Sequence, residues 1–511
     1  MRIWIGVFVL FLLPGWSMPI PSYAAPLDKV TIALTSETPT MDPHVDSNFI
    51  GSMVWRWTYD TLISSETGSG KVVPWLAEKW EKLGPTQTKF WLRKDARFTD
   101  GSPVTAQAVK YSIERILNPA LKSRQLPYFA EFDRIEIIDD HSFIWHSKVA
   151  DNGLFNRLLR WGHVMSPKTR EMDRTVFARS SFGSGPYKLA SWTKGQRMVL
   201  EANPAWWGRK QFPNMPKTIV LRAIAESATR VKSLLADEVD IIIGVPPHMM
   251  AQIQDNPQKV AASVPGVRIM FLNFDTRHGG PLADVNVRKA INHAIDVESI
   301  RKTILGNRAE IIGQLYHPWN YAGYNPDKKW HEFDLAKARA SLKASSYAGG
   351  FKAELYSASG RYPGDVPTCE AVAGMLKKIK IDATCRPMNY SLYSKVRRAH
   401  QEKKQKDPAI FLAAFGNSGG DPALVARAVL GCQGAWSFHC FPDIDEAVNK
   451  AAAMSDPKEQ HAAFEKVTDM VKEKALLSIF YRTHDIYGYN KALNFVPRHD
   501  EALYPWEITV K

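Results

Sequence analysis

The 511-residue sequence contains few cysteines and, after its first residues, no long apolar segment. Only four cysteines occur, and none of them precedes Cys369. Beyond the run Ile3–Leu13, no stretch approaches the roughly 18 apolar residues that a membrane-spanning helix requires. A cysteine-dense scaffold is therefore excluded, and we expect the mature chain to be soluble.

The sequence also lacks the motifs of several enzyme classes. It has no H-E-x-x-H, no Walker A and no dinucleotide-binding glycine pattern, so metalloprotease, NTPase and dehydrogenase functions have no support. Residues 416–420 do match G-x-S-x-G, in which Ser418 would be a nucleophile. However, Asp421-Pro422 is a good N-cap and N1 pair, so the next helix should begin too late for a nucleophile elbow. We expect no enzyme, and an exported serine hydrolase is only a remote alternative.

Residues 1–24 have the pattern of a secretory signal peptide. Arg2 precedes the apolar run, and the small residues Ser22 and Ala24 suit a cleavage site. No cysteine is available there for lipid attachment. We expect a cleaved, non-lipidated periplasmic protein; the alternative is a permanent N-terminal anchor.

The length and net charge of the chain limit the number of domains and the kinds of partner that we expect. A chain of 511 residues predicts two or three domains, and 45% hydrophobic with 23% charged residues is typical of globular proteins. The formal net charge of +14 arises from scattered Lys and Arg, which indicates a basic solvated surface; attraction to anionic solutes or to a membrane face is the alternative. Nucleic acid is not an expected partner of an exported chain.

The four cysteines predict two disulfides. Export makes disulfides possible, and Cys432 and Cys440 bracket a short loop. Cys369 opens a helix-like stretch and Cys385 ends the strand-like stretch after it, which brings them close. A zinc site formed by His439 with Cys432 and Cys440 is the alternative, but its spacing matches no common structural site.

Hydrophobic periodicity predicts alternating strands and helices, hence an α/β protein. Thr105, Asp284 and Asp296 are candidate helix N-caps, and Gly306 is a candidate helix stop. Strands are expected at 29–34, 88–93, 185–192, 197–202, 218–224, 239–244, 351–355, 380–385 and 476–489, and helices at 49–63, 105–117, 227–238, 285–295, 297–306, 369–379, 422–430, 443–453 and 457–474.

The segment FWLRKDARFTDGSPVTAQAVKYSIERILNP, residues 90–119, resembles the signature of the family 5 extracellular solute-binding proteins. These are the peptide- and nickel-binding receptors of ABC importers. Segments 183–208 and 284–296 resemble further parts of the family, and 430–448 resembles the disulfide loop of its dipeptide-binding branch.

The resemblance implies a two-lobed periplasmic-binding-protein fold of the large, three-domain type, in which strands near 271–277 and 478–484 cross between the lobes. Function would be capture of a peptide or peptide-like solute by hinge closure and delivery to the permease subunits, by a monomer without cofactor or metal. The expected divisions are a signal peptide (1–24), a lobe I core (25–49, 183–270 and 482–511), an accessory subdomain (50–182) and lobe II (271–481).

The resemblance also implies a ligand site. The loop should face the cleft and bind the ligand through Phe415, Asn417, Ser418 and Asp421. Arg361 should hold a ligand carboxylate, and Trp436 should stack on the ligand; a surface role for Arg361 and a core role for Trp436 are the alternatives. Met41 and Asp42 should line the other wall.

Ser418 stands where related receptors place the aspartate that binds the ligand's α-ammonium group. A hydroxyl cannot neutralise that charge, so ordinary free-amine peptides are disfavoured unless Asp421 or Asp42 supplies it. The alternative solutes are an opine, glutathione, a sugar-phosphate conjugate or a metal chelate.

Overall fold

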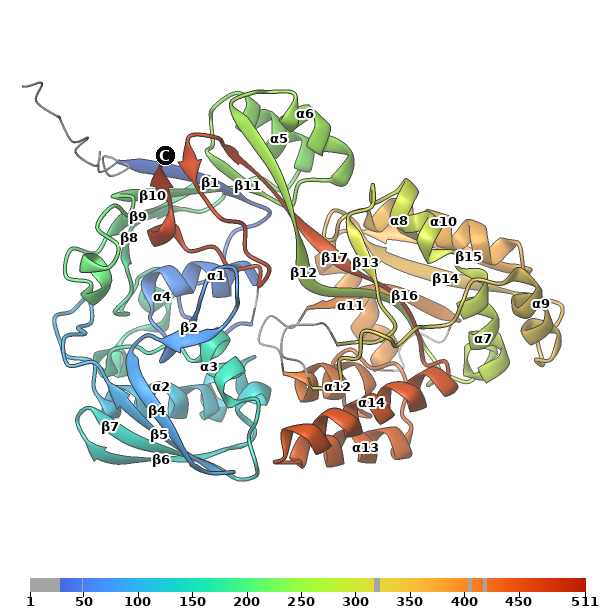
Figure 1. Cartoon of the computed structure of the whole chain (residues 1–511), viewed down its shortest axis with the longest axis horizontal. Helices are drawn as coiled ribbons and strands as arrows, with labels where there is room; N and C mark the ends of the chain where they lie inside the picture. Colours follow the sequence, from blue (N-terminus) through green and yellow to red (C-terminus); the bar gives the residue numbers. More distant parts are fainter. Residues whose placement is uncertain (1–27, 48, 317–321, 403–406, 417–420) are drawn as a thin grey trace, which may run out of the picture.

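The chain folds into two lobes joined by one continuous sheet (Figure 1). The computed structural model describes residues 28–47, 49–316, 322–402, 407–416 and 421–511. The sheet has the strand order β15-β14-β16-β12-β17-β11-β1-β10-β9-β8, and β13 pairs with β17. The two-lobed α/β fold expected from the resemblance is confirmed.

Lobe I is built on the end of this sheet that runs from β11 to β8. The helix predicted for 49–63 ends at Thr58, because Asp60 turns inward and accepts hydrogen bonds from Trp75 Nε1 (2.7 Å), Trp207 Nε1 (3.1 Å) and Ser184 Oγ (2.9 Å). The elements are β1 (Lys29–Leu34), α1 (Phe49–Thr58), β8 (Tyr187–Thr193), β9 (Arg197–Ala202), β10 (Thr218–Ala223), α5 (Ser227–Leu235), β11 (Ile241–Ile243), α6 (Met250–Gln254), β18 (Leu493–Asn494) and β19 (Thr509–Val510).

An antiparallel sheet with the order β4-β5-β7-β6 forms a second body within lobe I. Helix α2 begins after Thr105, whose side chain accepts a hydrogen bond from Ala108 N, and ends at Asn118, as the sequence predicts. The elements are β2 (Ile63–Ser65), β3 (Val72–Pro74), β4 (Ala77–Gly84), β5 (Gln87–Leu92), α2 (Ala106–Leu117), β6 (Phe132–Asp139), β7 (Ser142–Ser147), α3 (Leu154–Trp161) and α4 (Arg174–Phe177).

Lobe II packs helices around the opposite end of the large sheet (Figure 1). Asp284, Asp296 and Asp421 cap α7, α8 and α12 with their side chains, and Gly306 has the positive φ of a helix stop. The elements are α7 (Val285–Ala294), α8 (Val297–Thr303), β13 (Ala309–Ile311), α9 (Leu335–Lys343), β14 (Phe351–Ala358), α10 (Asp365–Lys377), β15 (Ile381–Met388), α11 (Tyr390–Gln401), β16 (Ala409–Gly416), α12 (Pro422–Leu430), α13 (Pro442–Ala453) and α14 (Pro457–Glu473).

Two long strands, β12 (Lys259–Phe274) and β17 (Leu477–Asn490), cross from one lobe to the other. Near Tyr489, β17 pairs with β11 of lobe I, whereas from Arg268 onward β12 pairs with β16 of lobe II. Between these regions the β12–β17 register shifts at Pro265–Ile269, because Pro265 cannot donate a ladder hydrogen bond. In β12 the crossing therefore lies before 271–277. The exact subdomain boundaries stay a prediction.

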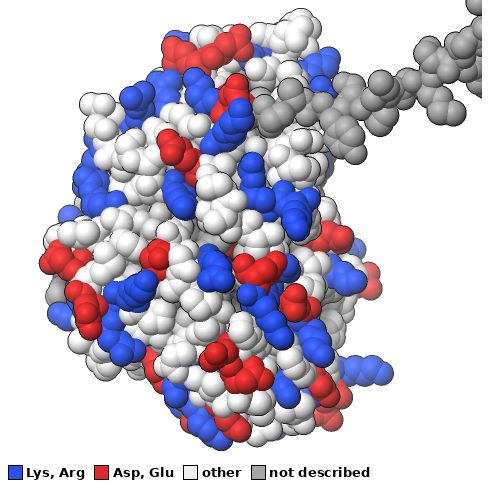
Figure 2. All heavy atoms as spheres, turned by 90° about the vertical axis from the view of Figure 1, so that its left-hand side faces the viewer, with Lys and Arg blue, Asp and Glu red and all other residues white. Residues whose placement is uncertain are grey.

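Acidic and basic side chains are interspersed over the face of lobe I shown in Figure 2. On that face the positive net charge does not gather into one patch. No helix among the described residues is long and apolar enough to cross a membrane.

Candidate ligand site at the lobe boundary

Arg361 is a cation at the boundary of the two lobes. The turn that carries it is held by Asp365, whose Oδ2 accepts hydrogen bonds from the backbone N–H groups of Arg361 (2.9 Å) and Tyr362 (3.1 Å). The guanidinium carbon lies 5.3 Å and 5.5 Å from the ring centroids of Tyr362 and Tyr390 in lobe II. It also lies 6.0 Å from the ring of Phe49 in lobe I. Among the described residues, no carboxylate lies within ion-pair distance of Arg361, so it can accept one from a ligand.

Two further arginines surround the ring of Phe49. The guanidinium of Arg160, from α3, lies 5.3 Å from its centroid, and that of Arg268, from β12, lies 5.6 Å away. Unlike Arg361, Arg268 is neutralised, because Glu501 accepts from its Nε (2.6 Å) and its Nη2 (2.9 Å). This pair joins the crossing strand to the C-terminal segment of lobe I.

Asp485 is an acidic residue of the crossing strand β17, close enough to Arg268 and Arg361 for their charges to act on it. Its Oδ2 is buried and has no hydrogen-bond partner among the described residues. Burial, with the charge of Glu501 in addition, raises the pKa of Asp485 well above its usual value, although Arg268 and Arg361 oppose the shift. The carboxyl is therefore poised to meet a hydrogen-bond donor or a cation.

Asp421 connects the two lobes. Its Oδ1 accepts from the N–H groups of Ala423 (2.9 Å) and Leu424 (3.3 Å) as the N-cap of α12, and its Oδ2 accepts from Arg157 Nη1 of α3 (3.1 Å). Arg157 also pairs with Asp151. The charge of Asp421 is thus already matched by a lobe I arginine.

Asp42, the second acid that the sequence offers as a countercharge for the ligand, is also in an ion pair. Asp42 accepts hydrogen bonds from Arg115 Nη1 (2.9 Å) and Nη2 (2.6 Å), in a bidentate ion pair with helix α2. Met41 has no exposed surface and packs in the core of lobe I. Their places on the cleft wall stay a prediction.

Phe415 and Trp436 lie edge to face, with ring centroids 5.9 Å apart, and Trp436 stacks with the guanidinium of Arg397 at 4.4 Å. Trp436 is half-buried and packs against the lobe II core, so the structure supplies a packing role. Asn417 and Ser418 lie outside the described residues.

The predicted site residues are thus brought together only in part. Arg361 lies beside residues that the sequence reasoning missed, namely Phe49, Tyr390, Arg268 and Asp485. In the sequence next to Arg361, the aromatic residue Tyr362 was the only indication of this site. Phe49, Tyr390, Arg268 and Asp485 come from distant segments, and only tertiary folding places them near Arg361.

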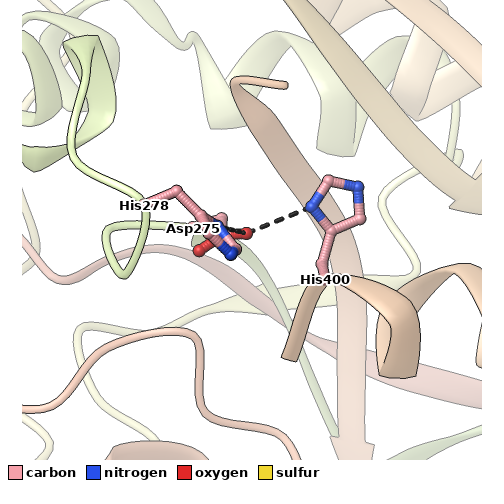
Figure 3. A group of neighbouring side chains, drawn as sticks. All are labelled: Asp275, His278 and His400. Atoms are coloured by element: carbon pink, nitrogen blue, oxygen red, sulfur yellow. Dashed lines mark hydrogen bonds and ion pairs between the residues drawn. The ribbon is translucent and has the colours of Figure 1, made fainter. Parts of the chain in front are cut away.

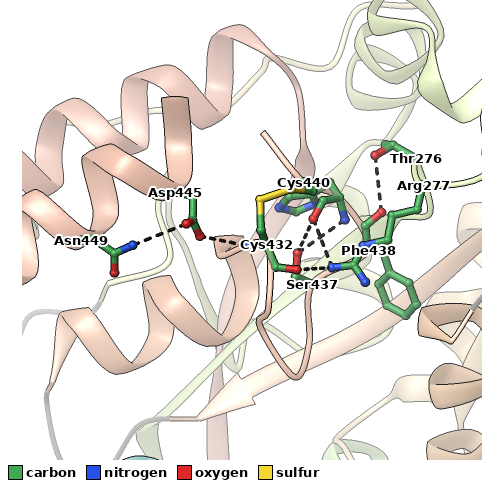
Figure 4. The surroundings of a disulfide bond; sticks show 9 residues. Thr276, Arg277, Cys432, Ser437, Phe438, Cys440, Asp445 and Asn449 are labelled. Carbon is green, nitrogen blue, oxygen red and sulfur yellow. Dashed lines mark hydrogen bonds between the residues drawn. A yellow bond between two sulfur atoms is a disulfide. The ribbon is translucent and has the colours of Figure 1, made fainter. Parts of the chain in front are cut away.

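Both predicted disulfides are present. Cys369–Cys385 and Cys432–Cys440 have Cα–Cα distances of 5.8 Å and 4.4 Å. The zinc alternative at Cys432 and Cys440 is therefore wrong, because both sulfurs are in a disulfide. The second bridge (Figure 4) closes a short loop. The carbonyl oxygens of Cys432 and His439 in this loop accept hydrogen bonds from Arg277 Nη2 (2.8 Å and 3.3 Å).

Helix α12 begins at Pro422, as the N-cap pair predicts. Ser418, the candidate nucleophile, lies outside the described residues.

Comparison with known proteins identifies the family. Residues 71–437 match the profile of the bacterial extracellular solute-binding proteins, family 5. Because this match covers more than half of the sequence, the chain belongs to that family, and the resemblance inferred from residues 90–119 is confirmed.

Individual relatives are more distant. The probable D,D-dipeptide-binding periplasmic protein DdpA of Escherichia coli K12 is 29% identical over 345 residues, which are 65% of this chain and 65% of DdpA. The Helicobacter pylori periplasmic binding protein DppA, solved with the peptide STSA, has a TM-score of 0.81 and 22% identity, and 95% of this chain and 98% of that chain align. AgaA of Agrobacterium tumefaciens R10, solved with agropinic acid, has a TM-score of 0.79 and 22% identity over 94% of this chain and 99% of that chain. These structures share the fold.

Proposed function

We propose that this protein is the periplasmic solute receptor of an ABC importer and that it carries a peptide-like solute whose carboxylate is bound by Arg361. Family membership supports the receptor class. The single observation that supports the solute class is a guanidinium at the lobe boundary with aromatic neighbours from both lobes and no carboxylate partner among the described residues.

The lobes provide the mechanism of capture. Phe49 comes from lobe I, whereas Arg361 and Tyr390 come from lobe II, so a solute held among them contacts both lobes only when these are together. Binding then shifts the population toward the closed form by the difference in affinity between the two forms. A permease could recognise that closed form. Export by a cleaved signal peptide, residence in the periplasm and action as a monomer are parts of the same proposal.

An anionic or amine-blocked solute is a second candidate, favoured by the state of the nearby acids. Asp421 and Asp42 already face Arg157 and Arg115, so neither offers a free countercharge to an α-ammonium group. Asp485 is the acid that could still do so, because its Oδ2 has no partner among the described residues.

Calorimetric titration of the mature protein, freed of co-purified ligand by reversible unfolding, tests the proposal. The solutes are free dipeptides, their N-acetylated forms and opines, chosen after a thermal-shift screen. We expect Arg361→Gln to weaken the best solute at least about tenfold, since a charge-assisted hydrogen bond contributes about 1.5–3 kcal/mol. Arg386→Gln is the matched control, because Arg386 is exposed and already paired with Glu354. Equal affinity of Arg361→Gln and wild type would refute the carboxylate anchor.

Asp485→Asn separates the two candidates. If the solute carries a free amine that Asp485 binds, this variant loses affinity for free dipeptides but not for acetylated ones. If the solute is amine-blocked, acetylated peptides or opines bind more tightly than free dipeptides and Asp485→Asn binds them as wild type does. If the protein binds none of these solutes, and mass spectrometry of the native protein identifies a different bound molecule, both candidate solute classes are wrong.

A further inference from the structure

Asp275, His278 and His400 bring three metal-ligating side chains together at the end of β12 (Figure 3). Asp275 Oδ2 lies 2.8 Å from His278 Nδ1 and 3.1 Å from His400 Nδ1. One ligand atom from each residue lies within 4.8 Å of the other two. We propose that these residues form a binding site for a divalent transition-metal ion, with Zn²⁺ as the representative ion.

The local structure orients the carboxylate. Asp275 directly follows β12, and its Oδ1 accepts from the backbone N–H of Arg277 (3.2 Å), which leaves Oδ2 facing the two imidazoles. The turn is anchored to the disulfide loop, because Thr276 N–H donates to Phe438 O (3.0 Å) and Arg277 donates to Cys432 O (2.8 Å) (Figure 4). The ligand positions therefore do not depend on a free surface loop.

His400 presents its Nδ1 to Asp275 from a buried position. It lies in the last turn of α11 with a fully buried side chain, and its Nε2 is 3.8 Å from Asp407 Oδ1. Asp407 in turn accepts a hydrogen bond from Tyr356 Oη at 3.2 Å. The 3.8 Å separation is too long for a hydrogen bond, and Nε2 has no hydrogen-bond partner among the described residues. Nδ1 is the ring nitrogen that faces Asp275 and the proposed ion.

The donor set selects the kind of ion. Imidazole nitrogen with carboxylate oxygen suits Zn²⁺, Ni²⁺, Co²⁺ or Cu²⁺, whereas Mg²⁺ and Ca²⁺ prefer oxygen alone. Bonds of about 2 Å in a tetrahedral site place neighbouring ligand atoms about 3.3 Å apart, and the two nitrogen–oxygen distances are close to this. His278 comes from the turn, and its side chain is nearly buried, with 7% of its surface exposed. Three protein ligands leave a position for water.

The site is separate from the proposed solute site. Asp275 is seven residues along β12 from Arg268, which at about 3.3 Å per residue corresponds to roughly 20 Å. Metal binding here is therefore independent of the proposed function, and the two proposals fail separately.

Zinc titration of the untagged, chelator-treated full chain tests the proposal by calorimetry. We expect one Zn²⁺ per chain, a rise of several degrees in the melting temperature, and at least a tenfold loss of affinity in His278→Gln and in His400→Gln. A Co²⁺-loaded sample should show the visible bands of a four-coordinate site, and these should disappear in His400→Gln.

The matched control is His293→Gln. His293 faces His331 with ring centroids 5.2 Å apart but belongs to no metal-ligating cluster among the described residues, so this variant should bind zinc as wild type does. Far-UV circular dichroism of the metal-free variants shows whether they fold. Arg361→Gln should leave zinc affinity unchanged. If wild type binds no zinc, the three residues are joined by hydrogen bonds alone and the proposal is wrong; unchanged affinity in folded His278→Gln and His400→Gln also overturns it.

Discussion

Arg157 of lobe I donates to Asp421 of lobe II at 3.1 Å, and both side chains are buried. Asp421 is also the N-cap of α12, so one carboxylate both begins a lobe II helix and holds the other lobe. Two further contacts cross the same boundary: Arg427 pairs with Glu131, and Asn152 Nδ2 donates to Met454 O (2.9 Å). Together these contacts join the two lobes on this side of the boundary.

Asp421→Asn should weaken solute binding. Asparagine keeps the N-cap hydrogen bonds but removes the charge that faces Arg157. Breaking a buried ion pair costs about 3–5 kcal/mol. The cost is smaller here because Arg157 keeps its second ion pair, with Asp151, in the variant. We therefore expect solute affinity to fall on the order of tenfold.

Calorimetry with the best solute measures the effect of Asp421→Asn. Arg427→Gln is the control at the same boundary and should change affinity less, because Arg427 is 42% exposed. Wild-type affinity in Asp421→Asn would show that the Arg157 contact does not contribute to closure.

Gly153→Ala should keep the lobes from closing fully. The φ of Gly153 is −88°, which alanine adopts without strain, but a Cβ there would collide with the carboxylate of Asp421 and with Arg157. Small-angle scattering at saturating solute should therefore give a larger radius of gyration than for wild type.

The control for this prediction is Gly349→Ala, because a Cβ at Gly349 meets nothing within 4 Å. A radius of gyration for Gly153→Ala equal to that of solute-saturated wild type would contradict the prediction.

His439 should make the protein less stable in acid. Burial, and then the charges of Arg277 and Arg288, lower the pKa of this imidazole from 6.5 to about 3. Between these pH values the unfolded chain binds a proton that the folded chain does not, so the free energy of unfolding falls as pH falls. Below pH 6.5, His439 lowers the free energy of unfolding by about 1.4 kcal/mol for each pH unit. Above pH 6.5, His439 causes no change of stability with pH.

Urea unfolding of His439→Phe at a series of pH values from 7.5 to 4.5 measures this contribution. We expect a shallower loss of stability than in wild type, although not a flat profile, because burial also lowers the pKa of His44 to about 4. His248→Phe, at an exposed position, should keep the wild-type slope. The same slope in His439→Phe would show that another group causes the acid sensitivity.

The two disulfides should stabilise the fold by different amounts. The Cys369–Cys385 bridge closes a loop with a sequence separation of 16, against 8 for Cys432–Cys440. Loop-closure entropy corresponds to about 3 kcal/mol for the longer loop and about 2.5 kcal/mol for the shorter one. We therefore expect the Cys369→Ala, Cys385→Ala double variant to lose more unfolding free energy than the Cys432→Ala, Cys440→Ala double variant.

Chemical denaturation of the two disulfide variants, with reduced wild type beside them, measures the difference. If the larger loss occurs in the variant without the short loop, the contacts of that loop with Arg277 outweigh the chain entropy.

Local signals in the sequence were enough for much of the fold. Thr105, Asp284, Asp296 and Asp421 begin helices where the capping rule predicts, because a cap depends on bonds within one turn. The alternation in 88–93 gave β5 within one residue. The sequence analysis missed helices α3, α4, α6, α9 and α11 and strands β2, β3, β4, β6, β7, β13 and β16.

The amino-acid sequence by itself determined the family, the α/β class, the helix caps and the two disulfides, because each depends on residues close together in the chain or on a continuous motif. Tertiary structure alone decided which charges meet. Arg361 lacks a carboxylate partner among the described residues, whereas Arg157 pairs with Asp421, 264 positions away, and His400 with Asp275, 125 positions away. No spacing rule reaches over such distances, since these contacts form only when the two crossing strands bring the lobes together and the sheet aligns its strand ends.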